Sequence, residues 1–421
     1  MTEQNQGGRA AAKPADSSLT TDDSRLSTPV LTTDDSRLTT PVRAGLIGCG
    51  SLSLIGILPQ LAEPDAKERV ELVAVCDVNE ERARETAVRF GVPHAYADPA
   101  DLISRDDIDL VLVITPIEYH YALAMDALRA GRHVYVQKTM ATTYAEARGM
   151  VETARERGLT LVAAPGQMLA PAMQAMKSLV DSGALGDVYW AWGNTGGWYH
   201  DEPTRRGEGA LGAVDPSWYY RAAGGPLRDV TVYVLHSLTG VLGPVRRVTA
   251  MSGIRAPVRH WRGKDIPVEV DDNSILLLDF GDATYAMAGG QASRTGPLVQ
   301  WGAMGIYGSG GAIETLEIEP LSGHPTRLSV AAQDGAAENA GLKQEDDGTY
   351  ELTSWLPYVT ETHAAIPEPH VYADILHAVD CIQQGTHPLV SGEHGAHVVE
   401  IIEKGYLAAR TGQTQDLVST F

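Results

Sequence analysis

Residues 42–50 read VRAGLIGCG, and a second apolar stretch, residues 71–77, reads ELVAVCD. The first stretch predicts a buried strand that turns at Gly48 and Gly50 and then opens a helix. Such a turn lets backbone amides approach a pyrophosphate, and an acid about 20 to 30 residues further on, here Asp77, can accept ribose hydroxyls. We interpret this segment as a binding site for NAD, although Ser53 stands where a third glycine is usual.

Apolar stretches and amphipathic helices alternate between residues 42 and 165. Predicted strands over 110–115 and 133–138 lie between predicted helices over 119–130 and 144–157. This alternation is typical of a doubly wound parallel sheet, in which ligands bind beyond the carboxyl ends of the strands. The residues expected along that edge are Gly48, Gly50, Ser51, Leu52, Asp77, Thr115, Pro116, Gln137 and Lys138.

Composition excludes several classes of partner. The chain has 54 acidic and 33 basic residues, and the resulting net charge of -21 repels phosphate backbones and anionic membranes. No apolar run approaches the roughly 18 residues that span a bilayer. The three cysteines are odd in number and have no CxxC spacing, which favours a reducing compartment. We expect a soluble, cytoplasmic protein without nucleic-acid or membrane partners.

Three segments are predicted. Residues 1–41 form a polar tail in which LTTDDSRLSTPV (19–30) recurs as LTTDDSRLTTPV (31–42). Residues 42–166 form the dinucleotide-binding Rossmann domain. Residues 167–421 form an α+β domain for substrate binding and oligomerisation, because runs of strands at hairpin spacing predict a large, mostly antiparallel sheet. Residues 320–350 are polar and predict a solvated insertion.

Several motifs together resemble the Gfo/Idh/MocA family of oxidoreductases. They are IGCGS at 47–51, ITPIEYH at 114–120, AGRHVYVQKT at 130–139, GALGDV at 183–188 and GGPLRDVTVYVLHSLTGVLGPVRRVTA at 224–250. The resemblance implies NAD as the cofactor, with His120 among the residues at its site, and a homo-oligomer, either a dimer or a tetramer. NADP is the less favoured cofactor, because Asp77 repels a 2′-phosphate, although Arg82 could compensate.

Lys138 is the central chemical candidate. A lysine at the carboxyl end of a parallel strand can hydrogen-bond a substrate hydroxyl and stabilise the alkoxide that develops as hydride leaves. In the family that the chain resembles, the lysine of an EKP motif has this role. Here Gln137 replaces the glutamate and Thr139 replaces the proline. The loss of a negative neighbour leads us to expect a pH dependence that differs from the family pattern.

Asp229, Tyr233 and His236 form the second catalytic constellation. On a regular helix, positions i, i+4 and i+7 share one face, so the three side chains are expected to point together toward the substrate. The family commonly has D-x-x-x-H, whereas this chain has tyrosine at the i+4 position and histidine at i+7. His236 is the preferred proton acceptor because imidazole titrates near neutral pH, and Tyr233 is the alternative.

Aromatic side chains suit the apolar faces of a sugar ring. The candidates for substrate binding are Trp198, Tyr199, Trp218 and Tyr219. No metal site is predicted, because the histidines lack ligand spacing.

The sequence thus predicts an NAD-dependent oxidoreductase that acts on a secondary hydroxyl or keto group of a sugar, cyclitol or glycoside. One alternative is a glycosidase of the same family, which oxidises C3 transiently and then eliminates the aglycone. An alternative of another class is a regulator that binds NAD or sugar without catalysis.

Overall fold

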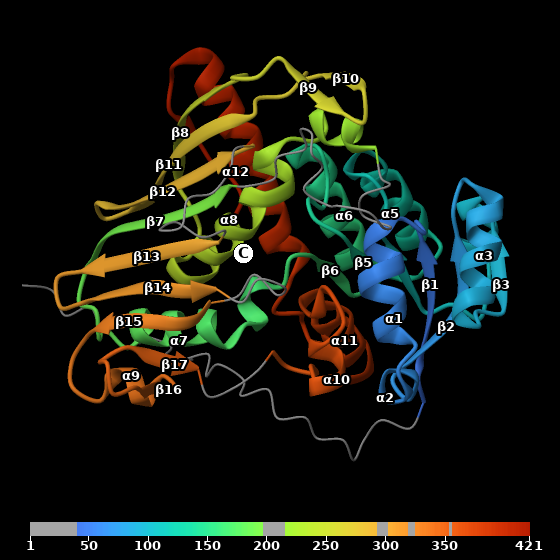
Figure 1. Cartoon of the computed structure of the whole chain (residues 1–421), viewed down its shortest axis with the longest axis horizontal. Coiled ribbons are helices and arrows are strands. Elements are labelled where there is room, and N and C mark those ends of the chain that lie inside the picture. Colours follow the sequence, from blue (N-terminus) through green and yellow to red (C-terminus); the bar gives the residue numbers. More distant parts are fainter. Residues whose placement is uncertain (1–39, 197–214, 293–301, 319–324, 353–355) are drawn as a thin grey trace, which may run out of the picture. The chain divides into compact units, whose positions relative to one another are not determined.

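The computed structural model describes residues 40–196, 215–292, 302–318, 325–352 and 356–421 (Figure 1). The predicted tail therefore lies outside the described residues up to residue 39. The first sheet contains six parallel strands in the order β3-β2-β1-β4-β5-β6. Its strands are β1 (Val42–Ile47), β2 (Val70–Cys76), β3 (His94–Tyr96), β4 (Leu110–Val113), β5 (His133–Val136) and β6 (Leu161–Ala163).

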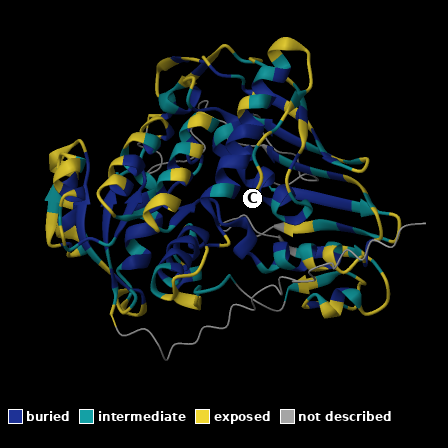
Figure 2. Ribbon diagram, turned by 180° about the vertical axis from the view of Figure 1, so that it is seen from behind, coloured by how far each residue is buried: buried dark blue, intermediate teal, exposed yellow. Residues whose placement is uncertain are grey.

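Helices connect these strands, and local signals explain where several of them begin. Asn79 and Asp98 accept hydrogen bonds at the first turns of α3 and α4, and Thr143 and Glu146 form a capping box on α6. Most residues of these strands are buried because helices cover both faces, as a doubly wound sheet requires, whereas the edge strand β3 is exposed or half-buried (Figure 2). The connecting segments are η2 (Ser53–Ile57), α1 (Leu58–Leu61), α2 (Pro64–Lys67), α3 (Glu80–Phe90), α4 (Pro99–Ile103), η3 (Ile117–Tyr119), α5 (His120–Arg129) and α6 (Tyr144–Arg157).

The second sheet has ten strands in the order β16-β17-β15-β14-β13-β7-β12-β11-β8-β18, and only its β7–β12 pair is parallel. Together, the two sheets confirm the predicted fold class. Its strands are β7 (Val188–Gly196), β8 (Arg247–Gly253), β11 (Asn273–Gly281), β12 (Thr284–Gln291), β13 (Ala303–Gly308), β14 (Ala312–Ile318), β15 (Pro325–Ala331), β16 (Leu342–Gln344), β17 (Tyr350–Leu352) and β18 (Gln415–Asp416). A separate hairpin is formed by β9 (Val258–Trp261) and β10 (Lys264–Pro267).

The expectation of a solvated insertion over 320–350 holds only in part, because most described side chains of 331–350 are exposed or half-buried but the segment belongs to the second sheet. From residue 325 onward this segment supplies β15, the short helix α9 (Ala336–Asn339), β16 and β17, which extend the edge of the second sheet. Leu328 and Leu342 bury their side chains in its core. The few apolar residues of the segment are enough because an edge strand needs only one buried face.

Helices α7 (Pro171–Asp181), α8 (Val232–Leu242) and α12 (Gly392–Thr411) cover one face of this sheet (Figure 1). Their apolar side chains form one core with inward residues such as Leu276 and Leu278 of β11. In contrast, α11 packs into the core of the parallel sheet. The other helical segments of this half are η4 (Gln167–Leu169), η5 (Pro216–Tyr220), η6 (Leu227–Thr231), α10 (Glu361–Ala364) and α11 (Pro369–Gln384). Within the described ranges, no helix is long and apolar enough to cross a membrane.

Candidate active site

The glycine turn lies at the carboxyl end of β1, next to the strand-order switch between β1 and β4. Gly48 has a φ of 105°, and a Cβ there would lie 2.3 Å from the carbonyl oxygen of Ile114, so only glycine fits. A Cβ on Gly50 would meet nothing within 4 Å. Ser53 is fully buried and donates to the carbonyl of Gly48 at 2.5 Å, which explains how serine replaces the third glycine. Ser51 opens the helix, as does Leu52.

Asp77 lies at the end of β2, as predicted from the sequence. Its carboxylate accepts hydrogen bonds from the backbone amides of Cys49 (3.0 Å) and Asn79 (2.9 Å). The guanidinium of Arg82 lies 3.4 Å from both carboxylate oxygens. A carboxylate has about four acceptor positions. The amides of Cys49 and Asn79 use two of them to hold the turn, and a ribose hydroxyl would take a position that now faces the more distant guanidinium of Arg82.

The end of β4 carries the TPIEYH motif. Pro116 is exposed, whereas the hydroxyl oxygen of Thr115 is buried without a hydrogen-bond partner in the described part of the chain. His120 is fully buried, and its two ring nitrogens lie 2.8 Å from the carbonyl oxygens of Thr115 and Thr139. Burial lowers the pKa of His120 to about 4, so the ring is neutral at neutral pH. His120 thus links the loop after β4 to the loop after β5. It lies beneath the carboxyl edge of the sheet, where the cofactor is expected, and stabilises these loops from inside the protein.

These features together fit a dinucleotide. The turn excludes a side chain at Gly48, leaves open space beside Gly50 and is followed by a helix, as pyrophosphate binding requires. Asp77 suits a ribose, and the Thr115 hydroxyl has no competing partner in the ranges described.

Lys138 follows β5 at the same edge. Its ammonium donates to both the carbonyl oxygen of Asp229 (2.8 Å) and the Asp229 carboxylate (2.5 Å), and the two side chains are 16% and 9% exposed. Thr139 donates to the carbonyl of Arg228. Gln137 instead binds the hydroxyl of Tyr135 at 2.7 Å. Asp229 is therefore the carboxylate that pairs with Lys138, while the uncharged Gln137 is bound to Tyr135.

Tyr233 lies beside this ion pair. The ammonium of Lys138 is 5.5 Å from the centre of the Tyr233 ring, which is within cation–π range. The Tyr233 hydroxyl lies 3.4 Å from Nε2 of His370 on α11. Burial raises the pKa of Tyr233 well above its ordinary value, and the negative charges of Glu368, Asp229 and Asp374 add to the effect. The sequence spacing gave no sign of His370, which is 137 residues from Tyr233.

His236 lies in different surroundings. Its ring centre is 4.5 Å from that of His394 on α12, and His394 accepts or donates a 2.7 Å hydrogen bond with Thr239. Desolvation lowers the pKa of His236 to about 3. The structure therefore brings Lys138, Asp229 and Tyr233 together and directs His236 toward α12.

A π-turn explains this separation. The i, i+4, i+7 spacing of Asp229, Tyr233 and His236 assumes a regular helix, but Leu227–Thr231 form the π-helix η6 and the α-helix α8 starts only at Val232. Because a π-turn holds more residues than an α-turn, it rotates the following residues away from the faces that regular spacing predicts.

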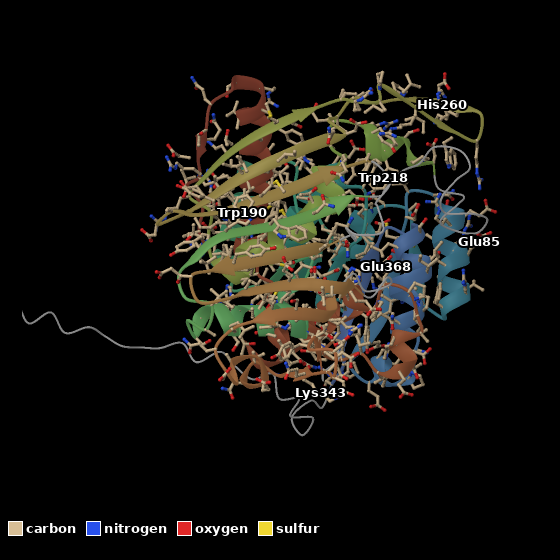
Figure 3. All side chains as sticks on the ribbon, turned by 60° about the vertical axis from the view of Figure 1, so that its left-hand side comes forward. Glu85, Trp190, Trp218, His260, Lys343 and Glu368 are labelled. Carbon is tan, nitrogen blue, oxygen red and sulfur yellow. The ribbon has the colours of Figure 1, made fainter. Side chains whose placement is uncertain are left out.

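The aromatic candidates for substrate binding divide into three cases. Trp198 and Tyr199 lie outside the described residues. Trp218 is half-buried on η5 (Figure 3). Tyr219 is buried, with its ring 5.0 Å from that of Tyr220, and belongs to a small core cluster. Of the two described candidates, Trp218 is therefore the one with exposed surface. Among the described residues, no group of three or more His, Cys, Asp or Glu residues could hold a metal ion.

A parallel sheet of this order, with a glycine turn and an acid along its carboxyl edge, is typical of a dinucleotide-binding domain. Residues 42–164 match the model described as "Oxidoreductase family, NAD-binding Rossmann fold", and residues 173–314 match that of the GFO/IDH/MocA C-terminal domain. The chain belongs to the Gfo/Idh/MocA family, and it is an NAD(P)-dependent oxidoreductase that acts on CH–OH groups.

Relatives and solved structures agree with this membership. D-apiose dehydrogenase of Paraburkholderia graminis is 25% identical over 386 residues, which is 90% of each chain. The dTDP-3,4-didehydro-2,6-dideoxy-alpha-D-glucose 3-reductase of Streptomyces violaceoruber is 31% identical over 73% of this chain and 82% of its own length. Levoglucosan dehydrogenase, solved with NADH and levoglucosan, shares the fold with a TM-score of 0.71 at 20% identity, covering 89% of this chain and 99% of that one.

Proposed function

We propose that the protein oxidises a secondary hydroxyl group of a sugar, cyclitol or glycoside, or reduces the corresponding ketone, with NAD preferred over NADP. The observation that carries this proposal is the position of Lys138. Its ammonium is held by Asp229 at the carboxyl edge of the parallel sheet and lies beside Tyr233. The names of the two curated relatives, which act on apiose and on a dTDP-linked sugar, support a carbohydrate substrate.

Each residue of the site has a separate role in the proposed reaction. Bound NAD supplies the hydride acceptor. Lys138 hydrogen-bonds the reacting oxygen and stabilises the negative charge that develops on it, because a fixed cation costs no reorganisation at that moment. Asp229 keeps the ammonium in place through two contacts. Tyr233, and not His236, carries the hydroxyl proton, since Tyr233 is the residue beside Lys138. Trp218 provides apolar surface for the sugar ring.

A homo-oligomer is also part of the proposal. One face of the second sheet exposes large apolar side chains, including Trp190, Met251, Ile275, Leu277 and Tyr285. Trp190 marks this face in Figure 3. Cross-strand pairing places Met251 opposite Ile275 and Tyr285 opposite Trp190, so these residues form one continuous surface. An apolar patch of this kind is typical of an association surface.

We expect Leu277→Asp to shift the protein to a smaller species in light scattering, because it places a charge within this surface. Val88→Asp, at an exposed apolar residue of α3, serves as the control and leaves the mass unchanged. A monomeric wild-type protein would contradict the assignment of this face.

The proposed domains are residues 42–166 for the cofactor and 167–421 for the substrate and for oligomerisation, with α11 returning to the first core. The three cysteines are free and buried, which supports the cytoplasm as the working compartment.

The activity is tested by incubating the full chain with NAD or NADP and a panel that includes D-apiose, other pentoses and hexoses, inositols and aryl glycosides. We expect NADH to form together with one keto product. Glycoside cleavage without net NADH would instead favour the redox-assisted glycosidase. Binding of NAD without any turnover across the panel would contradict catalysis and favour a regulator.

A further inference from the structure

Tyr233 begins a line of polar groups that leads away from the Lys138–Asp229 pair into α11. The Tyr233 hydroxyl lies 3.4 Å from His370 Nε2, and the two rings meet edge to face with centres 5.9 Å apart. His370 Nδ1 lies 3.7 Å from a carboxylate oxygen of Glu368. The His370 side chain is 7% exposed, whereas Glu368 is 35% exposed. The line therefore runs from a buried phenol to a carboxylate in contact with solvent.

A phenol in this position has a chemical difficulty as a base. Burial and the nearby carboxylates raise the pKa of Tyr233 well above its ordinary value, so the group is protonated at neutral pH. A protonated phenol accepts a second proton only if it releases its own at the same time. His370 is the group positioned to receive that proton.

We propose that Tyr233 and His370 form a proton relay, in which His370 is the final acceptor and Glu368 positions its ring. When the substrate C–H bond breaks, its hydride would go to the NAD that the proposed function requires, and the substrate hydroxyl passes its proton to the Tyr233 oxygen. The Tyr233 O–H bond breaks and its proton moves to His370 Nε2, which gives an imidazolium beside the Glu368 carboxylate. Reduction of a ketone runs the same steps in reverse. The inference rests on the proposed function and names the residue that completes it.

The charges around the relay are consistent with this direction of transfer. Lys138 and Asp229 form an ion pair on one side of Tyr233. Asp374, from the next turn of α11, has its pKa raised to about 8 by burial, and Tyr135 of β5 has its pKa raised well above 10. Both groups are therefore mainly uncharged at neutral pH, which leaves Glu368 as the anion that stabilises an imidazolium at His370.

Backbone features also hold Glu368 at this place. It lies before α11 with a φ of 62°, in the left-handed region that non-glycine residues rarely adopt. A Cβ on Gly56 of η2 would lie 2.9 Å from the Glu368 Cβ, so the glycine leaves room for it beside the cofactor-binding helix. The relay therefore borders the segment that follows the glycine turn.

The first test needs no substrate. In the full chain with NADH, histidines labelled with heavy nitrogen report which ring nitrogen of His370 carries the proton, with the signal assigned by its loss in His370→Asn. We expect the proton on Nδ1, with Nε2 as acceptor, and a changed His370 titration in Tyr233→Phe. A proton on Nε2 in the neutral ring, or a titration that Tyr233→Phe leaves unaltered, would overturn the relay.

The second test uses the panel substrate that gives the highest NADH rate. In the wild type, kcat/KM for oxidation falls as pH drops, because a protonated His370 cannot accept. We expect His370→Asn to lower kcat by about a hundredfold, as general-base losses do, with KM nearly unchanged and the acid limb abolished. Glu368→Gln, which keeps the histidine, is expected to move the acid limb to lower pH, since the imidazolium loses its anion.

His377→Asn is the matched control on the same helix. His377 is buried and accepts a hydrogen bond from the amide of Leu389, so its loss reduces stability without altering the pH profile. An acid limb that survives in His370→Asn, while Tyr233→Phe is inactive, would overturn the relay and leave the proposed function intact. Full activity in both variants would overturn both.

Discussion

Tyr233 and His236 lie three residues apart on α8, yet their surroundings differ. Tyr233 faces the ammonium of Lys138 and His370 of α11. His236 faces His394 of α12, and desolvation lowers the pKa of His236 to about 3. The comparison shows that a residue type with the right solution chemistry need not lie beside the candidate catalytic lysine. In this helix, the side chain that lies beside the lysine is the tyrosine.

The largest expected loss of activity comes from replacing Lys138, the lysine that lies beside Tyr233. Lys138→Ala is expected to reduce turnover by about a hundredfold or more, because it removes a contact with the developing alkoxide. NAD affinity, measured by tryptophan fluorescence, should change only a few-fold. Lys177→Ala removes a lysine from a solvent-exposed pair with Asp181 and serves as the control. Near-normal turnover in Lys138→Ala would show that Lys138 does not act on the substrate. Proximity to Lys138 would then no longer identify Tyr233 as the catalytic side chain.

The buried environment of His236 is tested by measuring how the free energy of unfolding depends on pH. His236 binds a proton more weakly in the folded chain than in the unfolded chain, so the unfolded state gains protons first as pH falls below about 6.5. Between pH 6.5 and 5 this linkage costs about 2 kcal/mol of unfolding free energy for one such group. His236→Asn should therefore flatten the acid side of the stability curve, measured by urea unfolding.

If the free energy of unfolding depends on pH with the same slope in His236→Asn as in the wild type, His236 does not have a lowered pKa. The difference in surroundings between His236 and Tyr233 would then be contradicted.

The smallest effect concerns a site away from α8. Asp77→Ala is expected to weaken NAD and improve NADP relative to it by about tenfold, because an acid that repels the 2′-phosphate is lost while Arg82 remains. Asp126→Ala, on the exposed face of α5, is the control for net charge. Fluorescence titration of both cofactors decides the question. Unchanged discrimination would mean that Asp77 only holds the turn through Cys49 and Asn79.

The sequence was informative where local pattern determines structure. The parallel sheet, the glycine turn with Asp77 and the helix over 144–157 were all predictable from periodicity and capping. The π-turn over 227–231 was not, because it occurs where Lys138 and Thr139 bind the carbonyls of residues distant in sequence. The contact of His370 with Tyr233 could not be predicted either, because it joins residues 137 positions apart in the sequence.

The most direct measurement compares the pH profiles of kcat/KM for Tyr233→Phe and His236→Asn with the best panel substrate. We expect Tyr233→Phe to lose about a hundredfold or more in kcat, and His236→Asn to keep the wild-type acid limb with turnover within a few-fold. The opposite result, with the limb lost in His236→Asn and turnover retained in Tyr233→Phe, would contradict the account and return the proton-acceptor role to His236.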